Sequence, residues 1–131
     1  MDVPIRFVDI DMFRHLNNVA VGHFYEEARY QLMSDARERV DVARKGRFVV
    51  VNVDTAYLRE TFYPGIVTIG SAILSKSRSS LVIAQALFKD DECLSVADTT
   101  TVYLEAGRPE AIPSILDTYF EPLAWRGQPQ A

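Results

Sequence analysis

The alternation of apolar and polar positions divides the first third of the chain into a short strand and a long helix. The apolar run at residues 5–8 predicts the strand. From Val21 onward, apolar or small residues recur at helical spacing and charged residues fill the positions between them, which predicts an amphipathic helix. Asn17 or Asn18 is suited to cap this helix, because an Asn side chain accepts a hydrogen bond from the first turn. We expect the helix to end near Arg39.

The rest of the chain consists of β-type runs separated by turn residues. A β-branched run followed by alternation predicts a long strand at 48–58, and Pro64-Gly65 marks the next turn. Three more strands are expected, at 66–75, 81–88 and 94–104, with a hairpin turn at 89–92 between the last two. Residues 108–123 are expected to form a short helical tail, and residues 124–131 to be loose.

The order of these elements restricts the fold class. One strand, one helix and four strands lack the β-α alternation that a doubly wound parallel sheet requires. We therefore predict an α+β fold, an antiparallel sheet of about five strands wrapped around one long central helix. With 131 residues, the chain is expected to form a single domain over 1–131. Such a sheet leaves edge strands and apolar surface exposed, so pairing with a second copy is expected.

Composition and charge remove several classes of protein. Hydrophobic residues at 48% and charged residues at 24% are typical of a globular domain and exclude disordered and collagen-like chains. The chain has no apolar run of membrane-spanning length, and its opening lacks the features of a signal peptide, so a cytoplasmic location is expected. A net charge of −4 disfavours nucleic acid as a partner. The single cysteine, Cys93, follows three acidic residues that disfavour its thiolate, which predicts a strand cysteine rather than a nucleophile.

Candidate chemistry is concentrated in the loop before the helix. The chain lacks the serine-hydrolase elbow, the Walker loop, the dinucleotide-binding glycine motif and the zincin motif. The loop contains two Asp, one His and two Asn within ten residues: Asp9, Asp11, His15, Asn17 and Asn18. Some of these are expected only to form turns and caps, and a metal site would lack a fourth strong ligand. A helix start, however, presents free N–H groups that stabilise an oxyanion, and Asp11 supplies a carboxylate beside it. This combination is suited to attack on an acyl carbonyl.

The same residues resemble a known family. Asp-Ile-Asp-Met-Phe-Arg-His-Leu-Asn-Asn at 9–18, followed by Phe-Tyr-Glu-Glu-Ala-Arg at 24–29, is similar to the signature of hotdog-fold acyl-CoA thioesterases of the 4-hydroxybenzoyl-CoA thioesterase type. That signature is an Asp-x-Asp-x-x-Gly-His-x-Asn-Asn loop leading into a helix with an aromatic-Glu-x-Ala-Arg pattern. The resemblance implies a hotdog fold and hydrolysis of an acyl-CoA or acyl-carrier-protein thioester to free acid and thiol.

The resemblance also assigns catalytic residues. Asp11 corresponds to the family's nucleophile or general base, and His15 to a catalytic histidine of the plant acyl-carrier-protein thioesterase relatives. Asn18 corresponds to the helix-start position whose backbone N–H points to the thioester oxygen. Two positions depart from the pattern, because Arg14 replaces the usual Gly and Val21 replaces the usual aromatic residue.

Substrate contacts are implied in the same way. The resemblance places coenzyme A at a dimer interface, with its phosphates near basic residues on the strand connections. Lys76, Arg78 and Ser79 match such a connection, Arg59 is a further candidate, and Asn17 and Val21 complete the predicted substrate contacts. Short basic turns are also common solvated surface. The acyl pocket is expected to draw on apolar residues from several elements: Phe13, Val21, Phe24, Tyr57 and Phe62. No metal and no cofactor are expected, coenzyme A being part of the substrate.

Two other functions of this fold class are weighed against hydrolysis. Hotdog enoyl-CoA hydratases pair Asp and His with four residues between them, whereas three separate Asp11 from His15 and five separate Asp9 from His15. A non-catalytic acyl-CoA-binding protein is the remaining alternative. The identity of the acyl group, the choice between coenzyme A and acyl carrier protein, the choice between a homodimer and a homotetramer, and the roles of Glu26 and Glu27 are left open by the sequence.

Overall fold

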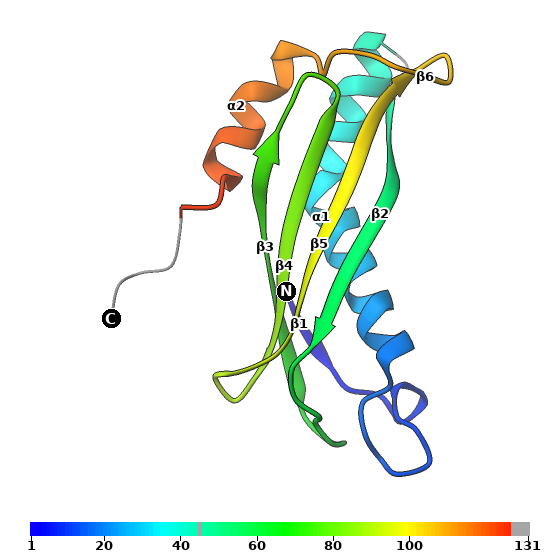
Figure 1. Ribbon diagram of the computed structural model, residues 1–131, viewed down its shortest axis with the longest axis vertical. Coiled ribbons are helices and arrows are strands. Elements are labelled where there is room, and N and C mark those ends of the chain that lie inside the picture. Colours follow the sequence, from blue (N-terminus) through cyan, green and yellow to red (C-terminus); the bar gives the residue numbers. More distant parts are fainter. Residues whose placement is uncertain (45, 127–131) are drawn as a thin grey trace.

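A curved antiparallel sheet packs against one long helix in the computed structural model, which describes residues 1–44 and 46–126 (Figure 1). The helix is α1 (Asn18–Arg44). The strands are β1 (Asp2–Pro4), β2 (Arg47–Tyr57), β3 (Ile66–Lys76), β4 (Ser80–Lys89), β5 (Glu92–Glu105) and β6 (Arg108–Pro109). Their order is β1-β3-β4-β5-β2, with β6 paired to β5, and every pair is antiparallel. This is the hotdog architecture, and it confirms the predicted fold class.

The N-terminal strand lies earlier than the sequence predicts. The structure has β1 at Asp2–Pro4 and a 3₁₀ turn at Phe7–Asp9, so the expected strand at 5–8 is wrong. The turn forms because the Arg6 N–H donates to Asp9 Oδ2 at 2.8 Å, which closes the chain on itself. The apolar run also does not share one face, since Ile5 is buried whereas Phe7 and Val8 are exposed.

The helix begins where its cap was predicted and ends five residues later than Arg39. Asn17 Oδ1 accepts the Val19 N–H at 2.8 Å, so Asn17 is the N-cap. After Gly22 in the first turns, no Gly or Pro interrupts the sequence before Gly46, where a Cβ would overlap the Tyr103 ring. Gly46 thus lets the chain pass close to the Tyr103 ring after the helix ends, where a side chain would not fit.

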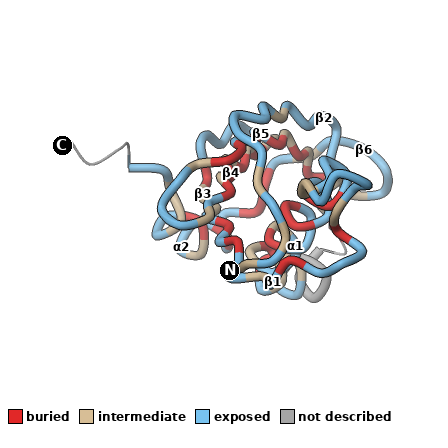
Figure 2. Tube along the Cα trace, turned by 90° about the horizontal axis from the view of Figure 1, so that it is seen from below, coloured by how far each residue is buried: buried red, intermediate tan, exposed pale blue. Residues whose placement is uncertain are grey.

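The core between α1 and the sheet contains two apolar clusters. Figure 2 shows the buried residues along α1 and along the strands that face it. One cluster contains Val21, Phe24 and Tyr25 near the helix start, and the other contains Met33 and Ala36 farther along. A polar layer lies between them, where Arg29 Nη1 donates to Gln85 Oε1 at 3.2 Å and to Thr99 Oγ1 at 3.3 Å. Burial lowers the pKa of the Arg29 guanidinium from its ordinary value, against the opposing charge of Glu26.

The C-terminal part closes one end of the sheet. Instead of one helical tail it forms β6, two 3₁₀ turns at Ser114–Leu116 and Glu121–Leu123, and the one-turn helix α2 (Asp117–Phe120). Ala124 forms a parallel bridge with Ile73, and the Trp125 N–H donates to Ile73 O at 2.7 Å. The loose tail expected from residue 124 is therefore wrong for these two residues, and residues 127–131 lie outside the described part. No helix in the described ranges is long and apolar enough to cross a membrane.

Candidate active site

Asp9 anchors the loop that precedes α1. Its buried carboxylate accepts hydrogen bonds from the Arg6 backbone at 2.8 Å and from Arg6 Nη2 at 2.9 Å, and its carbonyl accepts the Asn17 N–H at 2.8 Å. Burial by itself raises the pKa of the Asp9 carboxyl, but the hydrogen bonds and charge of Arg6 outweigh burial and lower that pKa below its ordinary value. Asp9 therefore has the structural role expected for part of this cluster.

Asp11 is held by one carboxylate oxygen. Its Oδ1 accepts the N–H groups of Phe13 at 2.9 Å and of His15 at 3.0 Å, and its own N–H donates to His15 O at 2.9 Å. These bonds make an Asx-type turn, the structural role that competes with catalysis. They use only Oδ1, and no described residue bonds Oδ2. The carboxylate is therefore oriented by the backbone and keeps one oxygen open.

The tip of this loop adopts the left-handed backbone region at Arg14, with φ of 68°. Glycine reaches that region without steric cost, whereas any other side chain brings its Cβ too close to the backbone. Arg14 is the position where the resembled signature has Gly, so the substitution leaves the loop in a conformation suited to glycine. The Arg14 carbonyl accepts the Tyr63 N–H at 3.3 Å, which ties the tip to the segment after β2.

His15 faces that same segment. Its ring packs edge-on against Phe62 with centroids 4.7 Å apart, and its Nε2 lies 3.6 Å from Glu60 Oε2. The imidazole does not line the cavity described below, whereas the His15 N–H bonds directly to Asp11. The position of His15 therefore supports a role in shaping the loop, and its predicted membership of the catalytic set gains no support from this geometry.

The start of α1 offers a free backbone donor. The Val19 N–H is taken by the Asn17 side chain, and the Val21 N–H donates to Asn17 O at 3.1 Å. The Asn18 N–H donates to no described acceptor. Because the positive end of the helix dipole adds to this donor, the Asn18 backbone is suited to stabilise a developing oxyanion.

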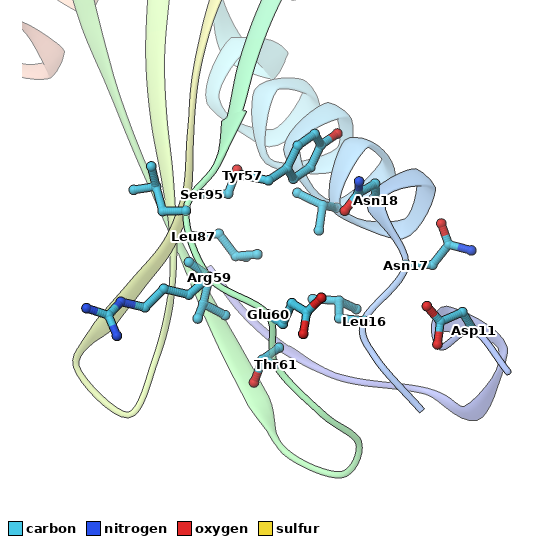
Figure 3. Close-up of a pocket in the computed structure, with 13 residues that line it drawn as sticks. Asp11, Leu16, Asn17, Asn18, Tyr57, Arg59, Glu60, Thr61, Leu87 and Ser95 are labelled. Atoms are coloured by element: carbon cyan, nitrogen blue, oxygen red, sulfur yellow. The ribbon is translucent and has the colours of Figure 1, made fainter. Parts of the chain in front are cut away.

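A cavity of about 480 Å³ joins these groups (Figure 3). Its polar rim contains Asp11, Asn17, Asn18, Arg59, Glu60 and Thr61, and its inner wall contains Leu16, Val21, Tyr57, Leu58, Leu87, Leu94 and Ser95. The helix start, the segment after β2 and the adjoining ends of β4 and β5 therefore meet in one concave site. A few polar groups around an apolar floor are typical of a pocket for a small organic group.

Part of this lining was not predicted from the sequence. Glu60 and Thr61 enter the rim because the Leu16 N–H donates to Thr61 O at 2.9 Å, a pairing between segments far apart in the chain. A polar segment directly after a long strand was the available signal. Of the five residues expected to form the acyl pocket, Val21 and Tyr57 line the cavity. Phe24 is buried in the core, and Phe13 and Phe62 lie beside His15.

The predicted phosphate contacts lie at the other end of the sheet within one chain. Ser80, at the turn that follows Lys76, Arg78 and Ser79, is seven residues along β4 from Leu87 in the cavity, or about 23 Å. Lys76 Nζ lies 3.6 Å from Asp117 Oδ1, and Arg78 Nη2 lies 3.9 Å from Glu110 Oε2. Arg59 does line the cavity, but its guanidinium is held by Glu92 at 2.7 Å and points away from the interior (Figure 3). Within one protomer Lys76 and Arg78 therefore lie far from the cavity, and their contacts with phosphate, predicted at a dimer interface, stay a prediction, as does that of Arg59.

Metal ligands do not converge in the described structure. No group of three or more His, Cys, Asp or Glu side chains within residues 1–44 and 46–126 is arranged to hold a metal ion. Cys93 is half-buried at the start of β5, and its Sγ lies 3.5 Å from Ser95 O, in agreement with a strand cysteine.

Comparison with known proteins places this geometry among thioesterases. The model of the thioesterase-like superfamily matches residues 5–119. The long-chain acyl-CoA thioesterase FadM of Escherichia coli K12 is 28% identical over 107 residues, which cover 78% of each chain. A predicted thioesterase from Bacillus stearothermophilus superimposes with a TM-score of 0.87 at 21% identity, over 98% of this chain and 97% of that one. A Thermus thermophilus thioesterase solved with coenzyme A and Zn gives a TM-score of 0.79 at 27% identity, over 94% and 92%.

Proposed function

The chain belongs to the thioesterase-like superfamily, and we propose that it hydrolyses an acyl thioester of coenzyme A or of an acyl carrier protein. The observation that carries this proposal is the cavity lined by both Asp11, with its open carboxylate oxygen, and Asn18, with its open backbone N–H. A carboxylate and an oxyanion donor are the two groups that attack on a thioester carbonyl requires. The similarity to an acyl-CoA thioesterase and to a coenzyme A-bound thioesterase supports the choice of substrate.

The reaction assigns one step to each group. The thioester oxygen accepts the Asn18 N–H, and the acyl group extends past Val21 toward the inner wall. An oxygen then adds to the carbonyl carbon, supplied either by a water that Asp11 deprotonates or by the Asp11 carboxylate itself. The negative charge that develops on the carbonyl oxygen is stabilised at the helix start. Collapse breaks the carbon–sulfur bond and releases the thiolate. In the water route the thiolate takes the proton that Asp11 removed from water; in the covalent route a second step, in which water cleaves the acyl-Asp11 anhydride, supplies that proton, and both routes yield free acid, thiol and the original carboxylate.

Glu60 is the rival carboxylate in the same cavity. Its side chain is largely exposed and accepts no hydrogen bond from the backbone of the described residues, whereas Asp11 is oriented by two such bonds. Orientation favours Asp11, because a catalytic group held in place loses less freedom on reaching the reactive geometry. The nearness of Glu60 to His15, at 3.6 Å, gives the alternative in which this pair holds the attacking water.

A dimer is part of the proposal. One edge of β2 pairs with no strand in the described chain, and this edge strand exposes Val50, Val51 and Val53. An unpaired apolar edge of this length is a template for another strand. A second copy joined antiparallel along β2 would reverse the sheet direction, so the turn with Lys76 and Arg78 of one copy would lie toward the cavity end of the other. That arrangement would return the two cations to a phosphate-binding role.

Two measurements test the proposed function. In an assay with a panel of acyl-CoAs and a thiol reagent, we expect release of free thiol at a rate proportional to enzyme concentration. Binding of the esters without thiol release would contradict hydrolysis and identify a carrier or sensor of acyl groups. In sedimentation at micromolar concentration, we expect a species at least twice the 14.8 kDa mass of one chain. A monomer would contradict the assembly.

A further inference from the structure

Two buried hydroxyl groups behind the cavity wall have no partner in the described chain. Tyr25 and Ser95 are each 1% exposed, and neither the phenol oxygen nor the serine Oγ has a hydrogen bond within the described residues. Burial raises the pKa of Tyr25, and a weaker hydrogen-bonding interaction with the Ser95 hydroxyl opposes that rise, so the two hydroxyls face each other; neither of them has a partner at full hydrogen-bond distance and angle within the described residues. A buried donor or acceptor left unsatisfied destabilises a protein, whereas Phe and Ala would fill these positions without that cost.

Ser95 and Tyr25 lie at and behind the cavity wall that the acyl group would face. Ser95 is itself part of the cavity wall, and Tyr25 packs in the same cluster as Val21, Leu87 and Leu94, which also line the cavity. Tyr25 follows Val21 by four residues, one turn along the same face of α1. An acyl group that enters past the helix start and Val21 would therefore reach Ser95 in the cavity wall, with Tyr25 in the layer directly behind that wall.

The chemistry of this wall indicates what the occupant carries. Burial raises the pKa of Tyr25 to about 12, so its phenol stays protonated at neutral pH and can donate. A trapped water needs two to four polar partners, and these two hydroxyls meet only the lower limit within an otherwise apolar floor. An oxygen attached to the substrate is held in place by the rest of the acyl chain and does not need additional partners. The surrounding side chains are mainly aliphatic, which favours an aliphatic chain over a flat ring.

We propose that Tyr25 and Ser95 select an aliphatic acyl group that carries a hydroxyl or oxo oxygen at the depth of Ser95. This inference rests on the proposed function for the orientation of the acyl chain. It adds a specificity: a site built to hydrogen-bond an oxygen discriminates strongly against the analogue that lacks it, because its buried polar groups are then left unpaired.

The test moves one hydroxyl along an octanoyl-CoA chain, carbon by carbon, and compares each ester with octanoyl-CoA. We expect one position at which the oxygen raises kcat/KM by about 10- to 100-fold. In Tyr25→Phe and Ser95→Ala, the ratio between that ester and octanoyl-CoA should fall toward one. Tyr30→Phe is the matched control, because it removes a phenol from an exposed position on the same helix, and it should keep the wild-type ratio. No preference at any position, or a preference that survives both substitutions, would overturn the proposal.

Binding separates this inference from the hydrolytic proposal. The same series is measured by calorimetry with analogues in which a methylene replaces the thioester sulfur, so that no bond can be cleaved. If the protein prefers the oxygenated analogue in binding but does not hydrolyse the esters, the specificity is supported and the proposed reaction is rejected. If it hydrolyses the esters without that preference, the reaction is supported and the specificity is rejected. Thermal unfolding gives a second check, because Tyr25→Phe and Ser95→Ala should not lower Tm if the hydroxyls lack partners in the free protein. A marked loss of Tm in both would overturn the proposal.

Discussion

The two ends of the β-sheet are closed by opposite kinds of contact. At the end where β3 turns into β4, Leu116 and Phe120 from the C-terminal segment pack against Met33 and Tyr103 and fill the space between helix and sheet. At the other end, the loop before α1 is held by hydrogen bonds to two carboxylates, and a cavity of about 480 Å³ remains beside it. Apolar contacts stabilise by filling volume, whereas directional hydrogen bonds fix a backbone and leave space next to it. The packed cluster that stabilises the fold and the cavity that holds the candidate catalytic groups therefore lie at opposite ends of the same strands.

The largest effect is expected from Phe120→Ala at the filled end. Phe120 is buried and packs at 5.5 Å from the Tyr119 ring and 6.1 Å from the Phe48 ring. Its truncation should lower the free energy of unfolding by about 3–5 kcal/mol, through lost burial and the cavity left behind. Ile115→Ala, at an exposed position in the same segment, should cost much less. Urea unfolding measures both, and kcat per folded molecule should not change. Equal losses in the two variants would show that this end is not the packed one.

Asp9→Asn tests the polar closure of the other end. The substitution removes the ionised acceptor of the Arg6 hydrogen bonds and should lower stability at pH 7 by about 1–3 kcal/mol. Because folding lowers the pKa of Asp9, its contribution is fully present above 3.8, the ordinary value, and is lost as pH falls through the lower folded value. The difference from wild type should therefore shrink in acid. Asp91→Asn, in the β4–β5 turn, removes the same charge at an exposed site. A difference that grew in acid would contradict the sign of this shift.

Replacing Lys76 and Arg78 together by Ala tests whether the filled end serves the cavity of a second copy. We expect KM for acyl-CoA to rise by about tenfold while kcat is kept, because remote phosphate contacts bind substrate and transition state alike. Arg108→Ala removes a cation from the neighbouring strand β6 and should leave KM near wild type. An unchanged KM, or a loss confined to kcat, would remove these residues from substrate binding.

The smallest effect is expected at the loop tip, where Arg14→Gly should raise stability by about 1 kcal/mol relative to Arg14→Ala. Both variants lose the side chain, but only glycine relieves the Cβ strain at φ of 68°. Thermal unfolding of the two variants provides the comparison. Equal Tm values would show that the left-handed conformation carries no strain.

The sequence predicts the parts of this molecule that depend on local pattern. A cap at Asn17 or Asn18, a long helix that starts there and the four later strands follow from periodicity and turn residues, and the structure has all of them, with Asn17 as the cap. The predictions that are wrong or missing concern features that depend on contacts between distant segments, or on side chains that form hydrogen bonds with the backbone. Residues 5–8 have a strand-like composition, but Asp9 draws the backbone of Arg6 into a turn. Glu60 lies in the site because the Leu16 N–H bonds to Thr61 O. A pairing between such distant segments cannot be predicted from the local sequence pattern.

The same contrast between local pattern and distant contacts holds for the site residues. The loop motif predicts a carboxylate beside the helix start, and Asp11 and Asn18, which lie within one short segment, both line the cavity. It did not indicate that His15 would turn toward Phe62 and Glu60, because the partner segment lies about 45 residues later in the chain. The positions of Tyr25 and Ser95 were equally hidden, since a Tyr on an apolar helix face and a Ser on a buried strand face are typical of ordinary core residues.

The most direct test of the central claim is kcat of Asp11→Asn beside that of Glu60→Gln, at saturating acyl-CoA. Asn keeps an oxygen that can accept the Phe13 and His15 N–H groups, so the loop and substrate binding should survive. It lacks the basic open oxygen, and kcat should fall by about 10² or more, whereas Glu60→Gln should stay within a few-fold of wild type. An Asp11→Asn enzyme that is folded, binds the ester normally and turns over near the wild-type rate would contradict the assignment of Asp11. A matching collapse in Glu60→Gln would transfer the role to Glu60 and His15.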